Sequence, residues 1–125
     1  DSAGYQNPAY FAELAHDGET ARAVVDPAHA RTLCAGHFPD DPLLPGAYLV
    51  ELMAEVGGLL FGEQAVAPPP VELVRCTFAA RITPDDRIAI VARRTAGGED
   101  GFLEAEVHVR GVRAAHAVLR FATPR

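Results

Sequence analysis

The sequence contains neither lysine nor tryptophan, and it has only two cysteines and one methionine. Because lysine is absent, the eleven Lys and Arg positions are all arginines. Acidic residues outnumber these arginines, and the net charge is -6. Nucleic-acid binding is not expected, because no dense basic stripe is present to displace phosphate counterions. Cys34 and Cys76 are too few for a disulfide framework, and no Cys/His spacing matches a metal site. We expect two buried free thiols and no metal.

Long apolar runs are also missing. No window approaches the roughly 18 consecutive apolar residues that a membrane span needs. No basic segment leads into an apolar one at the N-terminus. We therefore expect a soluble, cytoplasmic protein with no membrane partner. The length is close to the commonest domain size, and 49% hydrophobic residues are ample for one core, so we predict a single domain over residues 1–125.

One apolar segment in the first half of the chain predicts a helix. Pro45 suits a first helical position because its missing N–H would have no partner within the helix. We predict that this helix spans Pro45–Phe61. Apart from Glu51 and Glu55, its side chains are apolar or small on every face, which is typical of a buried helix. Gly57-Gly58 would weaken the helix locally but let a neighbouring backbone approach closely.

The second half of the chain has the pattern of β-structure. Turns rich in proline, glycine and aspartate separate its apolar segments. Over residues 102–110, apolar residues alternate with charged ones, which indicates an antiparallel strand with one buried face. The sequence predicts an α+β fold of one strand, the central helix and then an antiparallel meander of four strands, in which the sheet wraps the helix. The predicted strands are 19–25, 71–81, 87–94, 102–110 and 112–122, with one helical turn at 28–33 and a short helix or packed arm at 5–15.

Two titratable side chains lie in settings that suit proton transfer. His37 is in a loop stiffened by prolines, and Glu51 is on the apolar helix. An imidazole and a carboxyl form the pair that acid–base chemistry needs, although His37 taken alone fits a structural role equally well. Glu51 and Glu55 lie one turn apart and would repel each other. A solvated stripe is the ordinary interpretation of such a pair. If their face is buried instead, one carboxyl is kept protonated and can serve as a general acid.

The segment that carries these residues resembles a known family. The spacing between His37 and Glu51 is the specific part of the match, which extends from about residue 19 onward. The resemblance is to the stand-alone hotdog-fold 3-hydroxyacyl-[acyl-carrier-protein] dehydratases of fatty acid synthesis. It implies a hotdog fold, in which an antiparallel sheet wraps a long central helix. The matching residues are Gly36-His37-Phe38-Pro39, Pro42, Pro45-Gly46, Glu51, Met53-Ala54, Phe78 and a turn at Pro84-Asp85-Asp86.

The resemblance implies a role for each catalytic residue. His37 would remove a proton from C2 of a 3-hydroxyacyl thioester. Glu51 of the partner subunit would protonate the C3 hydroxyl as it leaves as water. Gly46 would stabilise charge on the thioester carbonyl, because helix amino ends favour anions. The residues expected to contact substrate are Phe38, Pro45, Tyr48, Met53, Glu55 and Phe78, with Leu43 and Leu49 as further tunnel candidates and core packing as the alternative for most of them.

The resemblance also implies partners. The substrate would arrive on an acyl carrier protein, and no cofactor is expected. The chain would form a homodimer, a higher homo-oligomer or a dimer with a paralogous chain. Carrier proteins are acidic in general, so exposed arginines near the tunnel mouth would dock them. The eligible residues are Arg75, Arg81, Arg93 and Arg94.

Three acidic residues depart from the family pattern. Asp40 and Asp41 replace the common Gly-Asn pair, and carboxylates close to His37 would raise its pKa and weaken it as a base. Glu55 stands where the family usually has Gln. These differences indicate a specialised dehydratase of fatty acid or polyketide-type biosynthesis. The alternatives are a catalytically weak subunit that binds carrier protein or a paralogue, and a hotdog thioesterase, against which the Gly-His-Phe-Pro loop argues.

Overall fold

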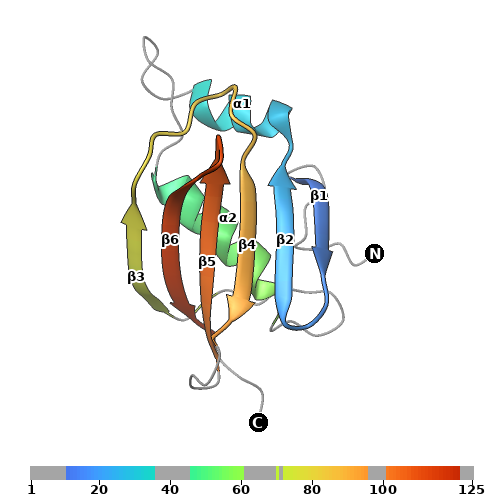
Figure 1. Cartoon of the computed structure of the whole chain (residues 1–125), viewed down its shortest axis with the longest axis vertical. Helices are drawn as coiled ribbons and strands as arrows, with labels where there is room; N and C mark the ends of the chain where they lie inside the picture. Colours follow the sequence, from blue (N-terminus) through green and yellow to red (C-terminus); the bar gives the residue numbers. More distant parts are fainter. Residues whose placement is uncertain (1–10, 36–45, 61–69, 71, 96–100, 122–125) are drawn as a thin grey trace.

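The computed structural model describes residues 11–35, 46–60, 70, 72–95 and 101–121 (Figure 1). In this part of the chain, strands carry most of the regular structure and two helices lie on one side of them. The elements are β1 (Phe11–His16), β2 (Thr20–Val25), α1 (Pro27–Ala35), α2 (Gly46–Gly58), β3 (Glu72–Phe78), β4 (Ala89–Arg94), β5 (Phe102–Val109) and β6 (Val112–Arg120).

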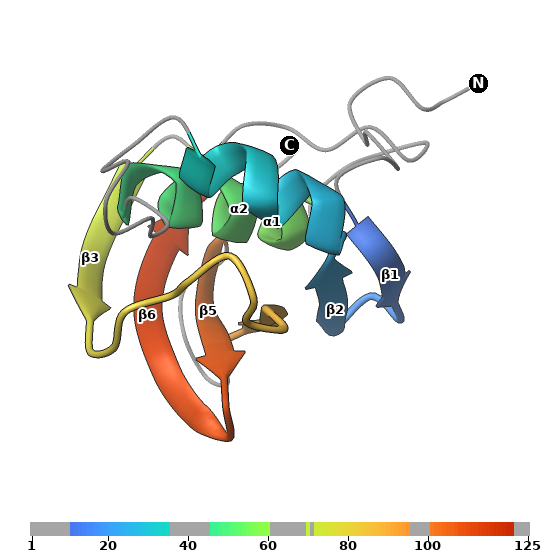
Figure 2. The ribbon, with the colours of Figure 1, turned by 90° about the horizontal axis from the view of Figure 1, so that it is seen from above.

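The strands form one sheet in the order β1-β2-β4-β5-β6-β3, and all neighbouring pairs are antiparallel. Seen from above, the sheet curves around α2, and α1 lies at one end of the sheet (Figure 2). The α+β prediction is therefore confirmed. Every strand expected after residue 18 is present, with bounds that differ by a few residues at its ends.

The predicted four-strand meander is wrong. A strand has two edges, and β4 uses both of them, since it pairs with β2 on one side and with β5 on the other. β3 therefore pairs with β6 at the edge of the sheet, and the connection over residues 79–88 crosses the end of the sheet to reach β4 (Figure 1). Only β4, β5 and β6 follow one another as expected.

Of the two alternatives for residues 5–15, the short helix is wrong over the described part, because residues 11–16 form edge strand β1, where Phe11 is buried. The cause is a tight turn. Gly18 has a φ of 92°, and the Asp17 carboxylate accepts hydrogen bonds from the N–H groups of Glu19 (3.0 Å) and Thr20 (2.9 Å). This turn folds β1 back onto β2. The single turn expected at 28–33 is longer, because the Asp26 side chain caps α1 by accepting from the Ala28 N–H at 3.0 Å.

The core lies between α2 and the concave face of the sheet. α2 contributes buried Leu49, Leu52, Met53 and Val56. The sheet contributes large aliphatic residues, such as Ile90, Leu103 and Leu119, together with several small ones: Ala21, Ala23, Ala92, Ala105 and Ala117. At Gly57 the close neighbour is a side chain and not the expected backbone, since a Cβ there would lie 3.0 Å from a methyl carbon of Leu103 on β5. The chain thus places the helix tightly against the centre of the sheet.

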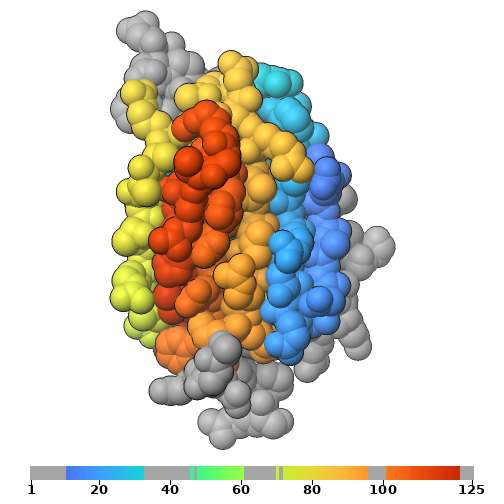
Figure 3. Space-filling view, viewed as in Figure 1, coloured from blue at the N-terminus to red at the C-terminus, as the bar shows by residue number. Residues whose placement is uncertain are grey.

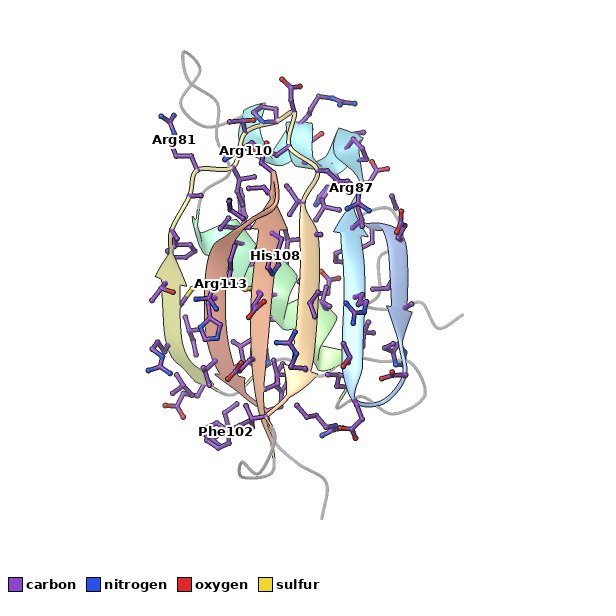
Figure 4. The ribbon with its side chains drawn as sticks, viewed as in Figure 1. Arg81, Arg87, Phe102, His108, Arg110 and Arg113 are labelled. Atoms are coloured by element: carbon purple, nitrogen blue, oxygen red, sulfur yellow. The ribbon has the colours of Figure 1, made fainter. Side chains whose placement is uncertain are left out.

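The outer face of the sheet is polar. The alternation predicted in β5 is confirmed, with Glu106 and His108 on this face. The Glu106 carboxylate lies 2.9 Å from His108, 3.4 Å from Arg113 and 3.8 Å from Arg93. The hydrogen bond to His108, followed by the arginines, holds the pKa of Glu106 below its ordinary value. Side chains of neighbouring strands form one continuous surface here (Figure 3), where His108 and Arg113 lie close together (Figure 4).

Candidate active site

The amino end of α2 and the carboxyl end of β3 meet at one end of the sheet. Gly46 is the first residue of α2, and Phe78 is the last residue of β3. A Cβ added at Gly46 would lie 2.9 Å from Cζ of Phe78 and 3.2 Å from both of its Cε atoms. The ring therefore rests against the start of the helix, and yet it is 52% exposed. Two predicted site residues from distant parts of the sequence are thus in contact.

β3 directs Phe78 toward the helix side of the sheet. Phe78 pairs with Ala115, and Cys76 pairs with buried Ala117. Alternate residues of a strand face the same side, so Phe78 and Cys76 both lie on the concave face. Cys76 is a free thiol, as expected, but it is only half-buried. Burial raises the pKa of this thiol. The side chain of Cys34 lies outside the described residues.

The segment that follows Phe78 is firmly attached to the core. The N–H groups of Ala79 and Ala80 donate to the Ala114 carbonyl, at 2.7 and 3.3 Å. Ile82 and Ile88 are buried. The expected turn at Pro84-Asp85-Asp86 is present, and the Asp86 N–H donates to the Thr83 carbonyl at 3.1 Å. The chain is therefore fixed on both sides of Phe78, by β3 before it and by this connection after it.

The Asp86 side chain joins this turn to the β5–β6 hairpin. Its carboxylate accepts from the Thr83 N–H at 2.8 Å and forms an ion pair with Arg110. The Arg110 guanidinium also donates to the Arg81 carbonyl at 3.0 Å. Burial alone would raise the pKa of Asp86, but Arg110 and the Thr83 N–H together hold it below its ordinary value. No sequence pattern pointed to Arg110, because its contacts depend on how the strands are ordered.

The other predicted site residues on α2 differ in how far their side chains are buried. Met53 and Leu49 belong to the core, in line with the packing alternative. Tyr48 and Glu55 are half-buried. Glu51 is exposed, so one chain by itself does not provide the buried face on which the protonated carboxyl depends. α2 begins one residue later than predicted, at Gly46.

Several expected site residues lie outside the described residues. These are His37, Phe38, Asp40, Asp41, Leu43 and Pro45. The chain order still places this segment immediately before Gly46. Among the described residues, no group of three or more His, Cys, Asp or Glu side chains is placed to hold a metal ion. None of the described helices is long and apolar enough to cross a membrane.

Comparison with protein families identifies the chain. The family model described as ApeI-like, ApeI dehydratase, matches residues 13–115. The chain belongs to the ApeI-like dehydratase family. This match spans β1 to β6 and includes the positions of His37, Gly46, Glu51 and Phe78.

A curated relative carries a related name. The 3-hydroxyacyl-[acyl-carrier-protein] dehydratase FabZ of Aeromonas hydrophila is 27% identical over 84 residues, which are 62% of this chain and 55% of that protein. A relative from Aeromonas salmonicida matches equally well. The chain therefore spans about half the length of the curated relatives that it matches.

Solved structures share the fold. The dehydratase heterocomplex ApeI:P from Xenorhabdus doucetiae superimposes with a TM-score of 0.62 at 16% identity, over 86% of this chain and 95% of that one. A mutant of a hypothetical thioesterase from Streptococcus pneumoniae gives 0.67 at 13% identity, over 90% and 91%. The ApeI-like chain thus has a hotdog fold. Because proteins named for different reactions share this fold, activity must be argued from the site.

Proposed function

We propose that this protein removes water from a 3-hydroxyacyl thioester on an acyl carrier protein and leaves the 2-enoyl thioester. The observation that carries the proposal is the amino end of α2 beneath the half-exposed Phe78 ring, in a chain of a dehydratase family. The name of the Aeromonas hydrophila relative supplies the substrate class. The residues of the site support the type of reaction, which is a proton abstraction followed by loss of water.

Charge builds on the thioester carbonyl oxygen when a base takes the C2 proton. The amino end of α2 is suited to this charge, because its first N–H groups have no partner within the helix and its dipole favours an anion. No acidic residue lies in the first turn of α2 to compete for them. Gly46 offers the first of these N–H groups, since proline at position 45 has none. One such donor contributes on the order of 10² to 10³ in rate.

His37 and Glu51 complete the reaction. His37 takes the C2 proton, and the Glu51 carboxyl gives a proton to the C3 hydroxyl, which leaves as water. Glu51 lies five residues beyond Gly46, or about 7.5 Å along the helix axis. Its side chain is exposed in the single chain, so a second protein surface is needed to exclude water and favour its protonated form.

The edge strand β3 is where a second chain that supplies this surface would bind. Among the described residues, Leu73, Val74, Phe78 and Val112 are the exposed large hydrophobic side chains, and the first three lie on β3. An apolar edge strand is a template for pairing with another chain. We propose that a second copy, or a paralogous chain, pairs with β3, so that Glu51 of one protomer serves His37 of the other. The name of the ApeI:P heterocomplex, a structure with the same fold, supports the option of a paralogous partner.

Three variants, assayed with thioester analogues as substrates, test this mechanism. The His37→Ala variant loses the base, and the Glu51→Gln variant keeps the shape of the acid without its proton. We expect each to lower kcat for enoyl formation by about 10² or more. The Glu104→Gln variant makes the same change on the outer face of the sheet and is expected to retain wild-type kcat. Release of free thiol by the wild type would indicate a thioesterase, and no turnover would indicate a weak, carrier-binding subunit.

A further inference from the structure

The fold separates the four arginines that are eligible to dock an acidic partner. Arg94 lies at the carboxyl end of α2, where its guanidinium bonds to the Leu60 carbonyl and donates to the Gly18 carbonyl at 3.0 Å. A cation at this end of a helix stabilises the helix itself. This is the end of α2 opposite Gly46, so Arg94 is not at the proposed site.

Two more of these arginines belong to the outer face of the sheet. Arg93 follows buried Ala92 on β4, so it faces outward, and it lies 3.8 Å from Glu106. Arg75 is paired with Val118 on β6, between the inward-facing positions 117 and 119. Both side chains are therefore separated from the amino end of α2 by the sheet.

Arg81 alone among the four lies at the end of the sheet where α2 begins. Figure 4 shows its side chain on the connection after β3, directed away from the strands. It follows Phe78 by three residues, a stretch of chain that spans at most about 11 Å. Its side chain is exposed. Arg81 is thus beside the proposed site but is not part of the core.

The backbone of Arg81 is fixed, although its side chain is exposed. Arg110 donates to the Arg81 carbonyl at 3.0 Å while it pairs with Asp86. The next residue, Ile82, is buried. A contact held in place before binding loses less conformational entropy when a partner arrives. This local rigidity distinguishes Arg81 from a cation on a loose loop.

We propose that Arg81 is the contact that recruits the acidic carrier protein to this end of the sheet. The inference rests on the proposed function and names the residue that its partner meets. A chain with a net charge of -6 repels an acidic protein as a whole, so attraction requires a local cation where the thioester must enter. Arg81 provides that cation beside Phe78 and Gly46.

The test compares KM for carrier-borne substrate with KM for a short thioester analogue in two variants. Arg81→Glu is expected to raise the ratio of these KM values about tenfold at low salt, and added salt is expected to shrink the difference. Arg93→Glu is the matched control, because it makes the same charge change on the outer face of β4, away from the edge strand that is proposed to pair with a second chain. It is expected to change the ratio less than about twofold.

An unchanged ratio in Arg81→Glu, or an equal rise in Arg93→Glu, overturns the inference while leaving the proposed dehydration intact. If the wild type converts neither substrate, the proposed function fails. Docking is then decided by the affinity of the same variants for labelled acyl carrier protein, where Arg81→Glu must bind more weakly than Arg93→Glu. Should Arg81→Glu fail to fold, Arg81→Ala replaces it and must raise the ratio in the same direction.

Discussion

The ring of Phe78 occupies the space that any side chain at position 46 would need. A Cβ at Gly46 would approach Cζ of the ring to 2.9 Å, which is closer than ordinary van der Waals contact. The atom that it meets is the far end of a half-exposed side chain, so the ring can be displaced. Gly46 therefore matters less for stability than for the position of Phe78 over the helix start.

This relationship predicts a rescue. Gly46→Ala is expected to lower kcat about 10- to 100-fold, because it pushes the Phe78 ring away from the amino end of α2. Its effect on the free energy of unfolding is expected to stay within about 1 kcal/mol, since alanine favours the helix. Adding Phe78→Leu, which removes Cζ, should restore part of kcat. Steady-state kinetics and urea denaturation measure both quantities.

Gly57→Ala is the control for that pair. Here the added Cβ would meet buried Leu103 at 3.0 Å in the middle of the core. Overpacking of this kind lowers stability by about 1 to 3 kcal/mol. An equal loss of stability at Gly46 and Gly57 would show that Gly46 is merely another tightly packed position.

The Asp86–Arg110 pair predicts a pH dependence of stability. The folded-state pKa of Asp86 is below its ordinary value of 3.8. Its contribution to stability is therefore present above pH 3.8 and is lost as the pH falls through the folded-state pKa. Asp86→Asn is expected to lower the free energy of unfolding by about 1 to 3 kcal/mol at pH 6. The difference from wild type should shrink at the acid end of a urea denaturation series, and a difference that is independent of pH would contradict this role.

Much of the sheet was predictable because its signals are local. Strand β5 follows from the alternation of Leu103 and Val107 with charged neighbours, and the β5–β6 hairpin follows from the turn at Gly111. The start of α2 at Gly46 agrees with the Pro45 signal to within one residue. These features depend on residues that are close in the sequence, so the sequence alone carries them.

The errors come from interactions between distant segments. The place of β3 beside β6 depends on which strand edges remain unpaired, and no residue within 72–78 encodes that. The contacts of Arg110 with Asp86 and Arg81 follow from the same strand order. The exposure of Glu51 depends on what covers α2, which an apolar sequence pattern does not specify.

The edge strand predicts an oligomeric state. Val74→Lys places a charge on exposed β3, and this is expected to convert a dimer into monomers and to abolish activity. Val112→Lys makes the same change at a similarly exposed valine on β6 and should leave the dimer intact. Sedimentation velocity distinguishes the two. A Val74→Lys variant that remains dimeric would exclude β3 as the interface.

Complementation tests whether the site is shared between protomers. The His37→Ala and Glu51→Gln variants are each expected to be inactive alone. When they are mixed and allowed to exchange subunits, half of the dimers are mixed, and each of these has one intact site. About a quarter of wild-type activity is therefore expected. If His37 and Glu51 of the same chain work together, the mixture stays inactive.

The most direct test of the account is the mass of the acyl group on its carrier protein after incubation with the wild-type protein. Dehydration predicts that the 3-hydroxyacyl group loses the mass of one water molecule and remains attached through its thioester. An acyl group of unchanged mass, or a carrier protein freed of its acyl group, would contradict the proposed activity.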